Sequence, residues 1–495
     1  MLRLSLLDAM FLLLERQHAP FHVGALSLFR PPAGAGAGFG TELAGRLRQS
    51  CKAGAPFNKR LVQSLGRNYW TNELDFDLDH HFVHVALPEG GKASDLPQMI
   101  ARMHGVHLDR GYPLWRTYLI EGLEDGRIAT YSKIHHSLVD GVAGIRLMLK
   151  SMSQDERMSV AMPAPWGINS QNGFAGTAPS AAAAAVDAAG SLGGLSLIPV
   201  LYRQLKQTLQ DFREHHPDLV TSFQAPRTIF NQDITGSRRF AARSYSMARI
   251  KAVASSLGGG TNDVVMALCA AALRHYLRDH GGLPARPLIA AVPVSLRADD
   301  SDSGNAVAGA LVNLATHMAD PVERFHAIKR SMDYSKARLR QMTPAQLYAY
   351  SAAMLAPGLL TMLPGMRRGI ANLVISNVPG PKQPMFWQGC QLDAIYPVSL
   401  LLNGFALNIT LVSGHDTVDF GLLGCSRTVP AMHLLLDHLE DALVELEDLT
   451  GPAMLQDIRS RSGEEAPPSF PSSRQDLPLI RHSGESRAPY LIRGG

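Results

Sequence analysis

The sequence has few of the residues on which several kinds of protein depend. Only 4 of its 495 residues are cysteine, and no two of them form a CxxC pair. That excludes a disulfide scaffold and argues against a zinc knuckle or a redox pair. Charged residues make up 18%, and 47 basic against 43 acidic residues leave a formal net charge of +4. That balance does not indicate nucleic-acid binding, and the composition excludes collagen, coiled coils and wholesale disorder.

Long apolar runs are also missing. No clean stretch reaches the roughly 18 residues that a membrane-spanning helix needs. The nearest candidate, residues 174–202, is mostly Ala, Gly and Ser and carries Asp187, so it supplies little transfer energy. The N-terminal stretch holds Asp8 among its apolar residues, and Glu15 and Arg16 follow without a small-residue cleavage site. We therefore expect no signal peptide and a cytoplasmic protein.

Two kinds of catalytic apparatus are not indicated. The chain has no GxSxG motif, which argues against a serine-hydrolase mechanism. The cysteines lack local support for a nucleophile, and no His/Cys/Glu cluster has the spacing of a metal site. We expect neither a metal nor a bound cofactor, and ordinary core or surface positions for the cysteines, which are Cys51, Cys269, Cys390 and Cys425.

Length and composition divide the chain into four regions. A chain of 495 residues predicts two to four domains at about 100–200 residues each. Residues 1–160 and 223–455 both alternate strand-like and helix-like segments, which suits two α/β domains. Residues 161–222 begin as a linker rich in Pro, Gly, Ser and Ala and then predict an amphipathic helix over 200–215. Residues 456–495 turn to Pro, Ser, Gly and Arg and predict a disordered tail.

Several elements can be placed from hydrophobic periodicity. The first half predicts a strand over 128–135 and a helix over 141–152. The second half predicts a helix over 261–280 with Thr261 as its N-cap, strands over 288–294 and 306–315, a hairpin over 406–412 and 418–423, and a helix from Pro430. The buried stripe of that last helix is expected to be Met432, Leu435, Leu436, Leu439, Leu443 and Leu446.

The most informative segment, residues 134–141, lies where a strand ends and a helix begins. Its sequence is IHHSLVDG. Adjacent side chains of a strand point to opposite faces, so we expect one of His135 and His136 to be reactive and the other structural. Asp140 is placed to cap the following helix, and Gly141 leaves room for close approach. Histidine can accept a proton at neutral pH, as a general base must; the alternative is a pair of core histidines with a capping aspartate.

The same segment resembles the HHxxxDG motif of the CoA-dependent acyltransferase superfamily, which includes chloramphenicol acetyltransferase and peptide-synthetase condensation domains. More specifically, the chain resembles the bacterial wax ester synthase/diacylglycerol acyltransferase family over about residues 4–450. The matching blocks, in family order, are residues 4–11, 22–26, 113–115 (PLW), 261–265 (TNDVV), 293–297 (PVSLR) and 376–381 (SNVPGP).

This resemblance implies a fold, a reaction and substrates. The fold would be two α/β domains of the chloramphenicol acetyltransferase type, with mixed sheets flanked by helices and the active site at the domain junction. His136 would be the general base that removes a proton from a fatty alcohol or diacylglycerol hydroxyl. The oxygen would attack long-chain acyl-CoA directly, without an acyl-enzyme. The tetrahedral oxyanion needs a donor, and the sequence leaves a backbone amide or a hydroxyl open.

The resemblance also suggests roles for other residues. Asp140 would hold the loop geometry, and Arg297 is a candidate partner for it. Asn262 and Asp263 are candidates for substrate binding, although an acid in the first turn of a helix also has an ordinary helix-start role. Pro113, Leu114 and Trp115 would line a substrate tunnel, with packing as the alternative. Residues 377–381 predict a rigid turn at a domain junction.

Other interpretations remain. Residues 135–140 also fit the Hx4D spacing of a differently folded acyltransferase class, in which His135 would be the base, but the FPEGTRS-type block of that class is missing. The acceptor could be another hydroxyl or an amine, or the protein could bind lipid without turnover.

Long apolar substrates imply peripheral contact with the membrane or a lipid droplet. Candidate segments are residues 200–215 and 347–366, the latter followed by Arg367 and Arg368, and both could equally be interior helices. Oligomeric state stays open.

Overall fold

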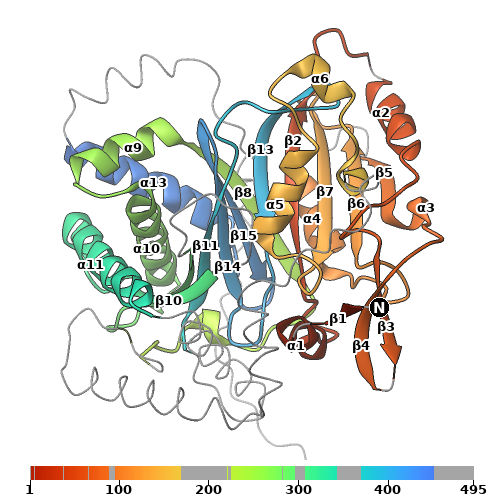
Figure 1. Cartoon of the computed structure of the whole chain (residues 1–495). Coiled ribbons are helices and arrows are strands. Elements are labelled where there is room, and N and C mark those ends of the chain that lie inside the picture. The colour runs from red at the N-terminus through yellow and green to blue at the C-terminus, as the bar shows by residue number, and fades with distance from the viewer. Residues whose placement is uncertain are drawn as a thin grey trace, which may run out of the picture.

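The computed structural model describes residues 2–4, 6–36, 38–64, 66–87, 95–168, 220, 224–280, 282–295, 307–342 and 370–450. Its strands form two six-stranded sheets, one in each half of the molecule, and a small three-stranded sheet. Figure 1 shows the two halves side by side, and four helices cover the outer face of the second sheet: α9 (Met247–Ser256), α10 (Thr261–Asp279), α11 (Pro321–Arg340) and α13 (Leu434–Thr450). The predicted segments 174–202, 200–215, 347–366 and 456–495 lie outside the described residues, as does Arg297.

The first sheet is mixed, as predicted. Its strand order is β12-β13-β2-β7-β6-β5, where β12 (Phe386–Trp387) and β13 (Cys390–Val398) come from late in the chain, and only β5 and β6 run parallel. The first-half strands are β2 (His22–Arg30), β5 (Phe82–Ala86), β6 (Trp115–Glu121) and β7 (Ile128–His135). The small sheet has β1 (Leu2–Arg3), β3 (Lys59–Ser64) and β4 (Arg67–Asn72). The helices are α1 (Leu6–Leu14), α2 (Phe39–Arg48), α3 (Leu78–His81), α4 (Asp95–Gly105), α5 (Gly141–Lys150) and α6 (Glu156–Val160), with a 3-10 turn η1 (Pro165–Gly167).

The second sheet is mixed too and confirms the predicted strands to within a few residues. Its order is β10-β9-β11-β14-β15-β8. Its strands are β8 (Arg238–Ser246), β9 (Ile289–Ser295), β10 (Val307–Asn313), β11 (Leu373–Pro379), β14 (Leu407–Ser413) and β15 (Thr417–Cys425). The helices are α9 (Met247–Ser256), α10 (Thr261–Asp279), α11 (Pro321–Arg340) and α13 (Leu434–Thr450), with a 3-10 turn η3 (Ile229–Asn231).

One predicted N-cap and one predicted helix start are wrong for local reasons, although α10 begins at Thr261 as predicted. Thr261 is the first helical residue of α10 and not its N-cap; Gly260 holds that position, and its N–H donates to the Asp263 carboxylate at 2.9 Å. The last helix begins at Leu434 and not at Pro430, because Ala431 has a φ of 45° that interrupts helical geometry. The predicted apolar stripe of this helix is buried.

The second half of the chain contributes two strands to the first sheet. Strands β12 (Phe386–Trp387) and β13 (Cys390–Val398) belong to the second half of the sequence, yet β13 pairs antiparallel with β2 in the first sheet. The predicted division at residue 223 follows chain order and gives no sign of this contribution. The halves are therefore joined by backbone hydrogen bonds as well as by side-chain packing.

The two sheets lie in close contact where β13 meets β15. The Asp419 carboxylate accepts the N–H of Ile395 at 2.8 Å and the hydroxyl of Ser244 at 2.6 Å. A Cβ atom added at Gly421 would lie 1.9 Å from the carbonyl oxygen of Pro397, so a side chain cannot fit without a backbone shift. Glycine at this position is what allows the two sheets to lie so close.

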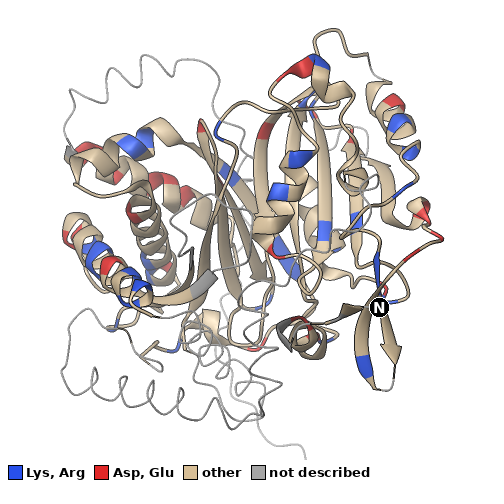
Figure 2. Cartoon of the chain, in the orientation of Figure 1, with Lys and Arg blue, Asp and Glu red and all other residues tan. Residues whose placement is uncertain are grey.

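Charge and hydropathy agree with the composition. Figure 2 shows basic and acidic residues interspersed on α2 and α11. In the parts of the chain that the structure describes, no individual helix is long and apolar enough to cross a membrane. Helices α9 and α10 have that length and composition only when taken together, and the chain bends by 98° between them. Cys51 is exposed, Cys269, Cys390 and Cys425 are buried, and all four are free, as expected for core and surface residues.

Gly421→Ala tests this close approach. We expect a loss of about 1–3 kcal/mol in the free energy of unfolding, the usual cost of overpacking, measured by urea denaturation. Gly45→Ala is the matched control, since Gly45 is exposed on α2 and a Cβ there meets nothing within 4 Å. This control should be neutral or stabilising. Equal effects of the two substitutions would contradict the account.

Candidate active site

The two adjacent histidines lie where β7 ends and a turn begins. The N–H of His135 donates to the carbonyl of Leu114 at 2.9 Å, and the N–H of His136 donates to the carbonyl of Phe21, also at 2.9 Å. The carbonyl of His135 then accepts the N–H of Leu138 at 2.9 Å, which closes the turn. Because the strand ends between them, the two side chains enter different surroundings.

The ring of His135 is locked in the interior. Its side chain is 1% exposed. Its Nδ1 atom accepts the backbone N–H of Ser137 at 3.1 Å and lies 2.6 Å from the Ser137 hydroxyl. A nitrogen that accepts an N–H carries no proton, so the neutral ring holds its proton on Nε2. That atom lies 3.6 Å from Oε1 of Glu15, an ion-pair distance longer than an ordinary hydrogen bond.

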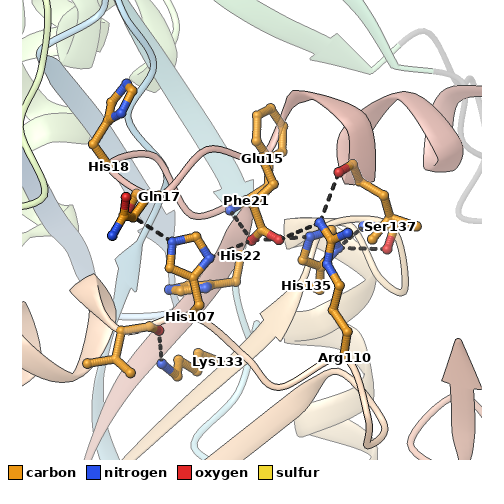
Figure 3. A network of polar contacts seen from close by, with 12 residues as sticks. Glu15, Gln17, His18, Phe21, His22, His107, Arg110, Lys133, His135 and Ser137 are labelled. Atoms are coloured by element: carbon orange, nitrogen blue, oxygen red, sulfur yellow. Dashed lines mark hydrogen bonds and ion pairs between the residues drawn. The ribbon is translucent and has the colours of Figure 1, made fainter.

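Glu15 is the centre of a polar network behind the histidines (Figure 3). Its carboxylate accepts the N–H of Phe21 at 3.1 Å and Nη2 of Arg110 at 2.8 Å, and it lies 3.3 Å from Nδ1 of His107. Burial raises the pKa of Glu15, but the interactions with His135, Arg110 and Phe21 outweigh burial and hold that pKa at about 2. Glu15 is therefore ionised at neutral pH although its side chain is only 7% exposed.

His136 differs from its neighbour in environment. Its ring packs against Phe11 of α1, with centroids 4.6 Å apart. Its Nδ1 atom is buried and has no hydrogen-bond partner in the described part of the chain. Burial lowers the pKa of His136, and the nearby Asp140 carboxylate opposes this shift in part. The ring is thus neutral near pH 7 and able to accept a proton.

Asp140 and Gly141 start α5 as predicted. The Asp140 carboxylate accepts the N–H of Ala143 at 2.8 Å, which is an N-cap interaction. A Cβ at Gly141 would meet nothing within 4 Å, so this glycine leaves open space beside the motif. Helix α5 packs through Val142 and Ile145 against a cluster that includes residues of β11, β13 and β14. The motif therefore lies at the junction of the two halves.

The PLW block supports the motif from behind. Leu114 is fully buried, and its carbonyl holds the end of β7. Trp115 is 1% exposed; its indole N–H donates to the carbonyl of Phe57 at 2.8 Å, and its ring stacks on His81. Trp115 is a packing residue in this structure. Pro113 and Trp115 also line a cavity of about 230 Å³, and a role for these residues in substrate binding stays a prediction.

The structure brings two of the predicted second-half blocks together. Nδ2 of Asn377 donates to Oδ1 of Asn262 at 3.3 Å, and the Ser413 hydroxyl donates to Oδ1 of Asn377 at 2.8 Å. Asp263 carries out the helix-start role through one carboxylate oxygen, while its other oxygen, Oδ1, is buried without a partner in the described residues. Substrate binding by Asn262 and Asp263 stays a prediction.

Sequence reasoning missed the polar residues that surround Glu15 behind His135 and the aromatic residue that packs on His136. Phe11 lay within a predicted block, but nothing marked it as the neighbour of His136. The one available signal for Glu15 was an acidic residue at the end of an apolar N-terminal segment, and it was used only to argue against a signal peptide. The remaining residues, Phe21, His107 and Arg110, carried no local signal.

Comparison with known proteins agrees with the fold and the motif. The two mixed sheets of this chain form a fold that it shares with solved condensation domains. The first condensation domain of the calcium-dependent antibiotic synthetase aligns over 91% of this chain and 96% of its own, with a TM-score of 0.57. At 16% sequence identity, this likeness speaks for the fold alone.

Family models identify the chain more narrowly. Residues 4–265 match the wax ester synthase/diacylglycerol acyltransferase catalytic domain, and residues 303–447 match the C-terminal domain of the same family. The O-acyltransferase WSD of Acinetobacter baylyi is 42% identical over 92% of this chain and 98% of its own length. The solved wax ester synthase/diacylglycerol acyltransferase of Marinobacter aquaeolei is 38% identical, covers 91% of this chain and 100% of its own, and has a TM-score of 0.75. The chain belongs to this family and is an acyltransferase.

The environment of His136 predicts a pH dependence. The neutral ring is the active form of a general base, so kcat/KM should fall as the pH drops through the pKa of His136. Because burial lowers that pKa, the midpoint of the acid limb should lie below 6.5. Asp140→Asn keeps a good N-cap but removes the carboxylate that raises the pKa, so the midpoint should move lower still. A midpoint above 6.5 or an upward shift in the variant, in rates measured from about pH 4.5 to 8, would contradict this assignment.

Proposed function

We propose that the protein transfers a long-chain acyl group from acyl-CoA to a fatty alcohol or to diacylglycerol, with His136 as the general base. One observation carries the choice of base. Nδ1 of His135 accepts the N–H of Ser137, and Nε2 lies 3.6 Å from the Glu15 carboxylate, without a hydrogen-bond partner in the described residues. The His136 ring has a buried Nδ1 without a partner in the described residues and a lowered pKa. This argues against the Hx4D interpretation, in which His135 would be the base.

The reaction needs only two proton movements. The acceptor hydroxyl gives its proton to His136 as its oxygen attacks the thioester carbonyl carbon. The tetrahedral intermediate then collapses and the bond from carbon to sulfur breaks. His136 returns its proton to the departing sulfur, so CoA leaves as a thiol. This scheme uses acyl-CoA as co-substrate and no metal or bound cofactor, and it passes through no acyl-enzyme.

The aromatic surroundings suit this chemistry. Phe11 stacks on Phe21, with ring centroids 5.4 Å apart, and also packs on His136. Phe11, backed by Phe21, covers one side of the base with apolar surface, which suits an apolar alcohol better than water as the nucleophile. Asp140 limits how far burial lowers the basicity of His136 and keeps it useful near neutral pH.

Acyl-CoA turnover tests the proposal. Purified protein should release thiol from palmitoyl-CoA only when hexadecanol or dipalmitoylglycerol is present. His136→Ala should lower this rate by at least about 100-fold while the protein stays folded, since a general base contributes at least that much. His135→Ala should act mainly by disturbing geometry and cost less.

The ranking of the two variants is decisive. A folded His135→Ala protein with a larger loss than His136→Ala would favour the Hx4D interpretation and overturn the assignment of the base. If neither acceptor supports thiol release although palmitoyl-CoA binds, the acceptor is a different hydroxyl or amine, or the protein is a lipid-binding protein without turnover.

We further propose that the protein meets its lipid substrates at the cytoplasmic face of the membrane or at a lipid droplet, through α1. This helix has a single charged residue, Asp8, and ends beside the site. Its Leu13 side chain is 74% exposed, only two residues from the Phe11 ring that packs on His136. An exposed apolar residue on the helix that also packs on the base would bring the site close to the lipid surface.

Leu13→Glu tests this contact. Binding to vesicles of equimolar phosphatidylcholine and phosphatidylglycerol should weaken at least about 10-fold in cosedimentation, since a leucine contributes roughly 1.5–3 kcal/mol when buried. Turnover of hexanoyl-CoA with hexanol should be unchanged. Leu74→Glu, which alters an even more exposed leucine between β4 and α3, is the control and should bind as the unaltered protein does. Equal binding by both variants would contradict a role for α1.

A further inference from the structure

We propose that Glu15 is the positioning residue of the active site, which fixes the proton of His135 and the orientation of His136 through one carboxylate. This inference rests on the proposed function of the two histidines. It adds a residue that lies 120 positions before the motif and belongs to the segment between α1 and β2.

The first link from Glu15 is to the side chain of His135. Ser137 presents an N–H to Nδ1, and the carboxylate of Glu15 faces Nε2. These two partners favour the same tautomer from opposite sides of the ring, because one donates to a bare nitrogen and the other attracts an N–H. The opposite tautomer would direct an N–H at the Ser137 amide and a lone pair at the carboxylate. Glu15 therefore helps to hold the ring in a single state.

The second link runs through the peptide groups of Phe21. Oε1 of Glu15 accepts the N–H of Phe21 at 3.1 Å, and the carbonyl of Phe21 accepts the N–H of His136 at 2.9 Å. The phenyl ring of Phe21 stacks on Phe11, which packs on the His136 ring. The backbone and one face of the proposed base are thus held by a residue whose own N–H is bound to Glu15.

The other partners of Glu15 keep the carboxylate in place. Arg110 donates from Nη2 both to Glu15 and to the carbonyl of Leu12, at 2.8 and 2.9 Å, so it fixes the end of α1 together with the carboxylate. His107 approaches from the other side at 3.3 Å. A glutamine at position 15 would have nearly the same shape but would lose the charge that these donors share.

Glu15→Gln tests the positioning role. We expect kcat for acyl transfer to fall about 10- to 100-fold, the usual effect of removing a group that orients a functional histidine, with KM for palmitoyl-CoA within about twofold of the unaltered protein. Glu121→Gln is the matched control, because Glu121 contacts another histidine of the same sheet, His84, at 3.0 Å. That variant should keep full activity even if its melting temperature falls equally.

A spectroscopic measurement on the unaltered protein makes the test independent of how the variant folds. Long-range correlation spectra of ¹⁵N-histidine-labelled protein report which ring nitrogen carries the proton. The signals of His135 can be identified by their loss in His135→Gln. We expect the Nε2–H form for His135, and a mixture of the two forms in Glu15→Gln.

The outcomes separate the two claims. Full activity in Glu15→Gln, a loss expressed only in KM, or an Nδ1–H form of His135 in the unaltered protein would overturn the positioning role. If the unaltered protein releases no thiol with either acceptor, the proposed function fails first, and the tautomer measurement still decides how Glu15 acts on His135.

Discussion

The geometry of the site depends on β7 ending at His135. If the strand continued by one residue, the side chains of His135 and His136 would point to opposite faces of the sheet and could not both serve one site. The turn after His135, closed by the N–H of Leu138, and the cap that Asp140 gives to α5 bring the chain out of the sheet within five residues. His135 can then face Glu15 while His136 packs on Phe11, and both remain part of one site.

The neighbouring strand β2 places a supporting residue beside the end of β7. Its register pairs His22 with His135, so Phe21, the residue just before β2, lies opposite His136. The same strand pairs on its other side with β13 from the second half of the chain. The second half also reaches the loop that precedes β2, since the Arg238 guanidinium on β8 donates to the carbonyl of His18 at 2.6 Å. Strand β2 thus carries both the support for the base and the joint between the halves.

The sequence was sufficient where the determining interactions are local. The strand over 128–135 matches β7. Helix α5 begins at Gly141 as expected, because the capping Asp140 and the N–H of Ala143 that it accepts are only three residues apart. Local reasoning failed for α13, where the φ of Ala431 delays the helix, and for the pairing of β13 with β2, which no local pattern encodes.

The partners of Glu15 show why the rest of the site was out of reach. They lie from 6 to 120 residues away in the chain, as Phe21, His107, Arg110 and His135, and they meet only after α1, α4 and β7 have packed. A single sequence shows an isolated acidic residue there. Family resemblance supplied the motif and its neighbours, but it treated residues 4–11 as a block and carried no information on which atoms of the motif are already bonded.

A buried carboxylate is an expensive way to hold two elements together, because burial alone opposes its ionisation. An apolar residue at position 15 could fill the same volume and pack α1 against the sheet. It could not accept the N–H of Phe21, and it could not distinguish the two tautomers of His135. The satisfied charge specifies one arrangement of donors and therefore one orientation for each histidine. Glu15 is better explained by the precision that a proton transfer requires than by the stability of the fold.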